Sequence, residues 1–206
     1  MHIAIAGNIG SGKTTLTKML AKQFNWIAEL EEIDDNPYLT SFYEDMQRWS
    51  FNLQVFFLNI RLRQVVEIQK KKKPVIQDRT IFEDACIFAP NLRDMGLMAS
   101  RDFDNYMSLF DLVSSFVQPP DLLIYLRAST STLVSQIQKR GRKYESSIRL
   151  DYLQSLNDRY EQWAASYNQG KILVIDVDTC KFFDNKADFG EVVNKVNAEL
   201  FGLFNK

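Results

Sequence analysis

A run of eight residues close to the N-terminus has the types and spacing of a phosphate-binding loop. It fits the pattern G-x-x-x-x-G-K-[ST] and reads Gly7-Asn8-Ile9-Gly10-Ser11-Gly12-Lys13-Thr14, with Thr15 next. Glycines allow backbone N–H groups to curl around a phosphate at a helix N-terminus, where the helix dipole favours anions. Lys13 is expected to reach the β- and γ-phosphates, and the Thr14 hydroxyl to bind Mg²⁺. The motif predicts that residues 7–15 bind a nucleoside triphosphate.

The stretches on either side of this motif supply the strand and the helix that it needs. An apolar strand is predicted over residues 2–6, and a helix with one apolar side over 13–24. The same alternation continues to the C-terminus, with strands predicted over 26–30, 74–78, 122–127 and 172–177, and helices over 39–47, 49–69, 103–117, 130–139, 150–167 and 187–201. Short apolar strands separated by helices predict a three-layer α/β fold around a five-stranded parallel sheet.

Length, composition and charge exclude several classes of protein. The 206 residues carry no repeat or linker, so residues 1–206 are expected to form a single domain. The balance of 25 Lys and Arg against 26 Asp and Glu argues against nucleic-acid or membrane partners. There is no membrane-length apolar stretch and no secretory signal, so we expect a cytoplasmic protein. With His2 as the only histidine, and with Cys86 and Cys180 as the only cysteines, a Ser-His-Asp triad, a multi-histidine metal site and a disulfide scaffold are excluded.

Two short matches to other nucleotide-binding classes are weak. Asn185-Lys186-Ala187-Asp188 spells the guanine-reading N-K-x-D, but none of the eight glycines has the Asp three residues earlier that a GTPase switch requires. Asp188-Phe189-Gly190 resembles the protein-kinase D-F-G only by letters, because a loop of this type is not that family's Gly-rich loop. A motor or recombination ATPase would need extra parts for which the chain leaves little room.

Several further stretches, taken in order, carry a more specific signal than the phosphate-binding loop. They are Glu31–Leu39, Tyr43–Gln54, Asp78–Asp84, Leu122–Arg127 and Lys139–Leu150, and they accompany the loop Gly7–Thr15. With them nearly the whole chain resembles the deoxyribonucleoside kinase family, specifically its bacterial deoxyadenosine and deoxyguanosine kinase-like branch. The resemblance implies transfer of the γ-phosphate of ATP, with Mg²⁺, to the 5′-hydroxyl of a deoxyribonucleoside in nucleoside salvage. It also implies a homodimer formed through long helices such as 49–69 and 103–117.

The resemblance gives the chemistry to residues that follow two predicted strands. Glu31 matches the family carboxylate that accepts the proton of the 5′-hydroxyl, in a motif E-P-V whose proline is Glu32 here. Either glutamate could act, and Glu31 is favoured. Asp78 would help to hold Mg²⁺, while Arg79 would contact the 5′-oxygen and the transferring phosphate; Thr80 replaces the family's Ser. Ligands bind at the carboxyl ends of parallel strands, so both groups fall on the same edge of the predicted sheet.

The same resemblance outlines an acceptor pocket. Gln54 matches the glutamine that reads the base through paired amide hydrogen bonds, and Phe88 the aromatic residue that stacks on it. Tyr43 and Glu145 match the pair that holds the 3′-hydroxyl, which would account for a deoxyribose acceptor. Trp49 could line this pocket or simply pack, and packing is favoured.

Two charged residues fall at the family's base-discriminating positions. Arg61 lies seven residues beyond Gln54 on one helix face, and Asp84 lies five beyond Arg79, about one and a half turns into a helix if that segment is regular. Members of the family that take deoxyadenosine, deoxyguanosine or deoxycytidine tend to carry such a pair, and thymidine-accepting members tend to have uncharged side chains. The pair predicts a preference for purines, with deoxyadenosine first, deoxyguanosine or deoxycytidine second and thymidine poor.

A basic stretch near residue 140 has the form of a lid. Lys139-Arg140-Gly141-Arg142-Lys143 places several cations around a glycine, within a lid expected over about 139–148. Arg140 and Arg142 are the best candidates to close over ATP and neutralise charge on the γ-phosphoryl oxygens. An arginine supplied within the chain means that no activating partner is required.

Two rival functions share parts of this pattern. A nucleoside monophosphate kinase such as thymidylate kinase also has the loop, the D-R strand end and a lid, but it needs cations for a dianionic acceptor. Residues 29–45 carry seven carboxylates and no Lys or Arg, which suits a neutral nucleoside better. A nucleotide-binding switch without transferase activity is the rival from another class.

Overall fold

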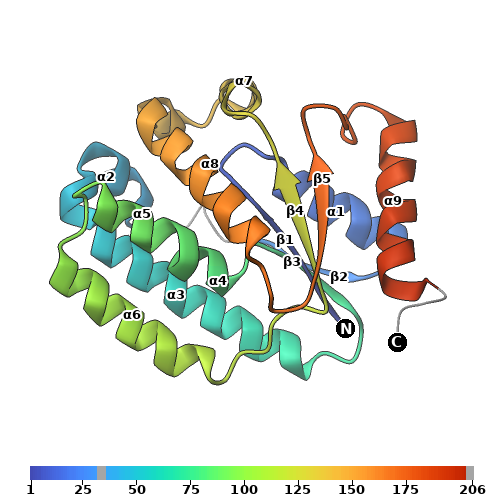
Figure 1. Ribbon diagram of the computed structural model, residues 1–206, viewed down its shortest axis with the longest axis horizontal. Helices are drawn as coiled ribbons and strands as arrows, with labels where there is room; N and C mark the ends of the chain where they lie inside the picture. The colour runs from blue at the N-terminus through green and yellow to red at the C-terminus, as the bar shows by residue number, and fades with distance from the viewer. Residues whose placement is uncertain (32–35, 203–206) are drawn as a thin grey trace.

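Five parallel strands form the middle layer of the fold (Figure 1). This computed structural model describes residues 1–31 and 36–202. The strands are β1 (His2–Gly7), β2 (Ile27–Glu29), β3 (Val75–Asp78), β4 (Leu122–Arg127) and β5 (Lys171–Asp176). Their order across the sheet is β2-β3-β1-β4-β5. The predicted fold class and all of the predicted strands are confirmed, with boundaries shifted by a residue or so.

Helices cover both faces of this sheet. They are α1 (Lys13–Phe24), α2 (Leu39–Glu44), α3 (Met46–Lys70), α4 (Ile81–Glu83), α5 (Ala89–Asp94), α6 (Ser100–Ser114), α7 (Thr130–Arg140), α8 (Leu150–Ala165) and α9 (Lys186–Phe201). In Figure 1, α3, α6 and α8 lie on one side of the strands, and α1 and α9 on the other. Within the described residues, no helix is both long and apolar enough to cross a membrane.

The strand pattern explains the two layers of core. Successive side chains of a strand point to opposite faces of a sheet. In β1, Ile3 and Ile5 belong to the core shared with α1, α7 and α9, whereas Ala4 and Ala6 face Trp163 of α8. The small alanines let α8 approach the sheet closely. A larger core lies among α2 to α6 and α8, and it contains the aromatic side chains that line the site described below.

Residues 79–102 differ most from the sequence prediction, which gave no bounds for a helix there and placed Asp84 on the condition that the segment after Arg79 is a regular helix. The structure has the short helix α4, then a π-helix, η1 (Asp84–Phe88), and then α5. Pro90 lies in the first turn of α5, where a missing N–H costs no hydrogen bond. A π-helix carries extra residues in its turn and often occurs at functional sites.

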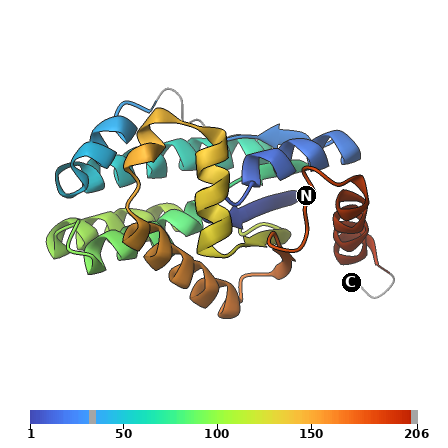
Figure 2. The same ribbon diagram turned by 90° about the horizontal axis from the view of Figure 1, so that it is seen from above.

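Smaller differences concern helix ends. The predicted break near residue 48 lies at Asp45, whose side chain accepts a hydrogen bond from the Arg48 N–H and begins α3 at Met46. In the predicted lid, α7 continues to Arg140 and ends at Gly141, whose φ of 68° is left-handed. A short 3₁₀ helix, η2 (Lys143–Ser147), follows. Figure 2 shows α7 and η2, yellow to light orange, crossing the view between α2 and α1.

Candidate active site

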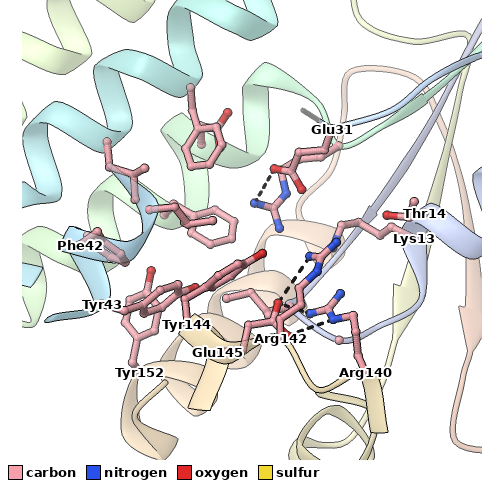
Figure 3. Close-up of a pocket in the computed structure, with 18 of the residues that line it drawn as sticks. Lys13, Thr14, Glu31, Phe42, Tyr43, Arg140, Arg142, Tyr144, Glu145 and Tyr152 are labelled. Carbon is pink, nitrogen blue, oxygen red and sulfur yellow. Dashed lines mark hydrogen bonds and ion pairs between the residues drawn. The ribbon is translucent and has the colours of Figure 1, made fainter. Parts of the chain in front are cut away.

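One cavity opens at the carboxyl ends of β1, β2 and β3 and brings together most of the predicted site residues (Figure 3). From the phosphate-binding loop, its lining includes Ile9, Gly10, Gly12, Lys13, Thr14 and Thr15. From the predicted acceptor and lid residues, it includes Glu31, Tyr43, Gln54, Arg79, Asp84, Phe88, Arg140, Arg142 and Glu145. Residues as far apart in the sequence as Ile9 and Glu145 therefore share one site, as the parallel sheet predicts.

Five predicted residues do not line the cavity wall. Gly7, Asn8, Ser11, Arg61 and Asp78 lie just behind it, within the described part of the chain. Asn8 donates from Nδ2 to the Leu153 carbonyl at 3.0 Å, so its side chain fastens the loop to α8. Glu32 lies outside the described residues.

The phosphate-binding loop is shaped by glycines with left-handed backbones. Gly10 has φ of 88° and Gly12 has φ of 93°. A Cβ at Gly10 would lie 2.8 Å from the Leu133 carbonyl oxygen, so only glycine fits at this close approach. Lys13, the first residue of α1, folds back and donates from Nζ to the carbonyls of Gly7 at 2.8 Å and Asn8 at 3.0 Å. Its ammonium group is thereby held over the loop.

The ammonium group of Lys13 is buried away from solvent. Burial, together with the positive charge of Arg79, lowers the pKa of Lys13 to about 8. A triphosphate in the loop would supply the negative charge that stabilises the ammonium form.

Thr14 and Asp78 form a pair at the start of α1 and the end of β3. The Thr14 hydroxyl donates to Asp78 Oδ2 at 2.5 Å. Asp78 Oδ1 is buried and has no hydrogen-bond partner among the described residues. Burial raises the pKa of Asp78, because the loss of solvation outweighs the attraction of the nearby Lys13 and Arg79 cations. A hydroxyl, a carboxylate with a free oxygen and the phosphates of a nucleotide are the ligand set that Mg²⁺ prefers, so these residues fit the metal.

Charged side chains from four elements meet beside this pair. Arg79 NH1 lies 3.4 Å from Glu31 Oε1, and Arg61 NH2 donates to the same oxygen at 2.5 Å. Arg61 Nε donates to Asp84 Oδ2. Burial opposes the charged form of Glu31, but Arg79 and Arg61 overcome it and lower the pKa of Glu31 to about 2. Glu31 is therefore a charged carboxylate at neutral pH.

Arg79 is held in an uncommon backbone conformation. Its φ of 67° is left-handed, and its N–H donates to the Ile5 carbonyl at 3.0 Å. Its guanidinium lies 4.4 Å from the centre of the Phe88 ring. A non-glycine residue in this region is strained and occurs often at functional sites.

Glu83 is a site residue that the sequence prediction missed. Its side chain is fully buried and accepts hydrogen bonds from the N–H of Gly7 at 3.3 Å, the N–H of Thr80 at 2.8 Å and the hydroxyl of Tyr160 at 2.9 Å. It also lies 4.0 Å from Arg79 Nε. It therefore ties the phosphate-binding loop to the turn that carries Arg79. The spacing of Thr80 and Glu83, a capping box, was the available signal.

Aromatic side chains and amides form the far end of the cavity. Tyr43 stacks on Tyr144, with centroids 6.0 Å apart and planes 10° from parallel (Figure 3). Gln54 is buried on α3, and its Oε1 has no hydrogen-bond partner among the described residues. Phe88 is buried at the end of η1. Trp49 packs against Tyr38 outside the lining, as the sequence favoured.

The two lid arginines converge on one carboxylate (Figure 3). Arg140 donates to both oxygens of Glu145, at 3.0 and 2.5 Å, and Arg142 NH1 lies 3.6 Å from Oε1. Glu145 is buried, while both arginines stay about one-third exposed. Glu145 thereby orients both guanidinium groups, which line the same cavity as the loop residues.

Comparisons with known proteins agree with this geometry. The family model for deoxynucleoside kinases matches residues 3–201. The deoxyadenosine/deoxycytidine kinase of Bacillus subtilis is 36% identical over 196 residues, which is 94% of this chain and 90% of that protein. The deoxyadenosine kinase of Dictyostelium discoideum is 37% identical over 210 residues, 98% of this chain and 85% of that protein.

A solved structure extends the similarity to three dimensions. The deoxyadenosine kinase of M. mycoides with bound dATP superposes with a TM-score of 0.85 at 30% identity, over 96% of this chain and all of that one. The predicted family resemblance and the kinase fold are confirmed. This chain belongs to the deoxynucleoside kinase family and is an ATP-dependent deoxynucleoside kinase.

Proposed function

We propose that this kinase phosphorylates the 5′-hydroxyl of deoxyadenosine in preference to other deoxyribonucleosides. The observation that carries this proposal is the buried Asp84 carboxylate on the cavity wall, with Arg61 bonded behind it. Such a carboxylate accepts a hydrogen bond from the exocyclic amine of adenine or cytosine, and thymine has no such amine. Relatives named as deoxyadenosine and deoxyadenosine/deoxycytidine kinases support deoxyadenosine as an acceptor. The proposal places deoxyguanosine or deoxycytidine second and thymidine last.

In this proposal the chain positions the two reactants and stabilises charge. Glu31 accepts the proton of the 5′-hydroxyl, and Arg79 contacts the 5′-oxygen and the transferring phosphoryl group. Lys13 neutralises the γ-phosphate. The 3.4 Å separation of Arg79 NH1 and Glu31 Oε1 supports this assignment, since one hydroxyl can reach both groups. Glu31 is preferred over Glu32, which lies outside the described residues.

Mg²⁺ is the metal that fits the Thr14 and Asp78 pair. The free Asp78 Oδ1 supports a role in holding the ion, directly or through water. An ion held there would neutralise the negative charge that develops on the phosphate oxygens during transfer.

The remaining assignments concern the sugar, the base and the donor. Tyr43 and Glu145 hold the 3′-hydroxyl of the sugar. Gln54 reads the base with its amide, and Phe88 stacks on it. The rest of the phosphate-binding loop (Gly7, Asn8, Ile9, Gly10, Ser11, Gly12 and Thr15) forms the ATP site together with Arg140 and Arg142. The shared cavity supports those members of the set that line it, and Gln54 Oε1, which has no partner among the described residues, supports base recognition.

We further propose a homodimer of single-domain chains. Exposed apolar side chains on α3, on α6 and just past α6 support an interface there: Val66, Leu109, Leu112 and Phe116. Phe116 is 69% exposed and Leu112 is 64% exposed, which is costly for large apolar groups in water. Sedimentation of the purified chain tests this proposal, and a monomer at micromolar concentration would contradict it. A cytoplasmic location stays a prediction.

The test of the proposed substrate is kcat/KM with MgATP for the four deoxyribonucleosides, alongside deoxyadenosine monophosphate. We expect deoxyadenosine to be the best acceptor and thymidine to be the poorest nucleoside. Thymidine as the best acceptor would contradict the proposed base pocket, while phosphorylation of only the monophosphate would contradict the nucleoside kinase assignment.

A further inference from the structure

Arg61 binds two carboxylates at once. Its NH2 group donates to Glu31 Oε1 at 2.5 Å and its Nε donates to Asp84 Oδ2, so one guanidinium holds both side chains. The Arg61 side chain is 1% exposed, the Asp84 side chain 1% and the Glu31 side chain 8%. Charges in such a buried place are poorly screened, so each feels the others strongly.

Arg61 does not line the cavity, whereas both of its partners do. Its guanidinium is packed 5.3 Å from the centre of the Phe57 ring, behind the cavity wall. Arg61 therefore bonds to two side chains that line the cavity without lining it itself.

The two carboxylates stand at different ends of the acceptor site. Glu31 lies next to Arg79 and is close to Lys13 in the phosphate half of the cavity. Asp84 begins η1, one turn before Phe88, in the half where the base is proposed to bind. The single positive charge of Arg61 is therefore shared between Glu31, the proposed proton acceptor, and Asp84, the proposed base-reading group.

Sharing limits how strongly Arg61 holds Glu31. While Asp84 is charged, its negative charge offsets part of the attraction that the Arg61 guanidinium exerts on Glu31. If Asp84 were neutral, Glu31 would be the only anion bonded to Arg61 among the described residues, and it would be held more tightly and would be less basic. A less basic acceptor removes the proton of a hydroxyl less readily.

We propose that Arg61 is a positioning residue that couples Asp84 to Glu31, so that Asp84 sets the transfer rate as well as reading the base. This inference rests on the proposed roles of Glu31 and Asp84. It explains why an arginine and an aspartate occur together here: either one alone leaves a buried charge that disturbs the proton acceptor. The pair then acts as a unit in turnover, even for an acceptor whose base forms no hydrogen bond.

The test uses an acceptor that removes base reading from the measurement. In the deoxyribonucleoside of 2,4-difluorotoluene, the base is replaced by a ring of similar shape without strong hydrogen-bonding groups. We expect Asp84→Asn to lower kcat for this acceptor by about three- to tenfold, since one pKa unit in the proton acceptor changes the rate by at most about tenfold. Adding Arg61→Met should restore kcat to within about twofold of the wild-type value, because Glu31 then keeps only Arg79 and Lys13 as neighbouring cations.

A matched control removes a different arginine from the same helix. Arg63 is exposed on α3 and bonds only to Asn59 among the described residues. Arg63→Met should not restore turnover to Asp84→Asn. Arg61→Gln/Asp84→Asn serves as a second neutral pair that retains hydrogen-bonding groups, and thermal unfolding of each variant checks its fold.

The outcomes separate this inference from the function on which it rests. Restoration by removing Arg61, but not Arg63, supports the coupling, because a purely structural arginine would lower kcat further when lost. If the wild type is active but neither double variant has a higher kcat than Asp84→Asn for this acceptor, the coupling alone is overturned. The coupling is also overturned if Asp84→Asn has the wild-type kcat for this acceptor. A wild type that phosphorylates no deoxyribonucleoside would instead overturn the proposed function.

Discussion

The two ends of the cavity are built in opposite ways. At the phosphate end, one continuous stretch supplies the loop, and its cation is held by the backbone: Lys13 Nζ donates to two carbonyls of the loop itself. At the acceptor end, the charged groups come from the segments just after β2 and β3, from α3 and from η1. They hold one another through ion pairs among Glu31, Arg61, Arg79 and Asp84.

Because of this difference, the two ends of the cavity are expected to tolerate side-chain substitutions differently. A site made by backbone N–H and C=O groups keeps its shape when side chains vary, and it recognises a phosphate common to all donors. A site made by mutually paired side chains changes as a unit, because loss of one partner leaves a buried charge unpaired. The acceptor end is therefore the place where specificity can differ, and where single substitutions are expected to act on several properties together.

The largest effect is expected at the phosphate end. Lys13→Ala removes the cation that is proposed to neutralise the γ-phosphate, and it should lower kcat by about a thousandfold, with the fold intact. Lys18→Ala is the matched control, since Lys18 is exposed on the same helix α1. The measurement is kcat with deoxyadenosine, together with the melting temperature. Wild-type turnover by a folded Lys13→Ala protein would contradict the assigned role of the loop.

At the acceptor end, the next largest effect is expected for Glu31→Gln. The amide keeps the shape of the side chain but cannot accept the hydroxyl proton, so kcat should fall by about a hundredfold or more. KM for the nucleoside should change little, because the carboxylate acts on the reacting hydroxyl rather than on the base. Glu32→Gln should have a much smaller effect. Equal losses in the two variants, or the reverse order, would mean that Glu31 is not the proton acceptor.

The contrast between the two ends of the cavity also explains which parts of the site could be predicted from the sequence. The phosphate-binding loop and the strand–helix alternation are local patterns, so their residues and positions were found directly. The pairing of Arg61 with Asp84 needed the family resemblance. Its geometry could not be derived, because Asp84 was placed by assuming a regular helix and the structure has a π-helix there.

Two further features depend on contacts between distant segments. Glu83 bonds to Gly7 and Tyr160, which are 76 and 77 positions away. Neither separation forms a motif that can be recognised in the sequence. The position of Arg61 behind the wall depends on how deeply α3 packs against β2 and η1. Periodicity identifies the buried face of a helix, but it does not say which buried residue reaches a cavity.

Replacing both members of the Arg61–Asp84 pair tests the specificity of the acceptor end. Arg61→Met/Asp84→Ala removes both charges, so that no buried charge stays unpaired. We expect kcat/KM for thymidine relative to deoxyadenosine to rise by about ten- to a hundredfold, because the pocket no longer holds polar groups that thymine leaves unsatisfied. The ratio is measured for all four deoxyribonucleosides. An unchanged ratio in a folded, active variant would refute the base-pocket assignment and leave the kinase assignment standing.

The smallest effect is expected at Glu83, which touches both ends. Tyr160→Phe removes the hydroxyl that donates to Glu83 Oε1 at 2.9 Å, while the N–H groups of Thr80 and Gly7 still donate to the same carboxylate. The buried carboxylate then lacks one partner, so the free energy of unfolding should fall by about 1–3 kcal/mol.

Activity should respond less than stability to this change. The loop and the Arg79 turn keep their other bonds to Glu83, so we expect kcat to stay within about threefold of wild type. Tyr167→Phe is the matched control: the Tyr167 hydroxyl is buried without a hydrogen-bond partner among the described residues, so its removal should cost no stability. Urea unfolding and kcat are measured on both variants. A Tyr160→Phe protein as stable as Tyr167→Phe would show that Glu83 does not join the two ends through α8, and that each end is held independently.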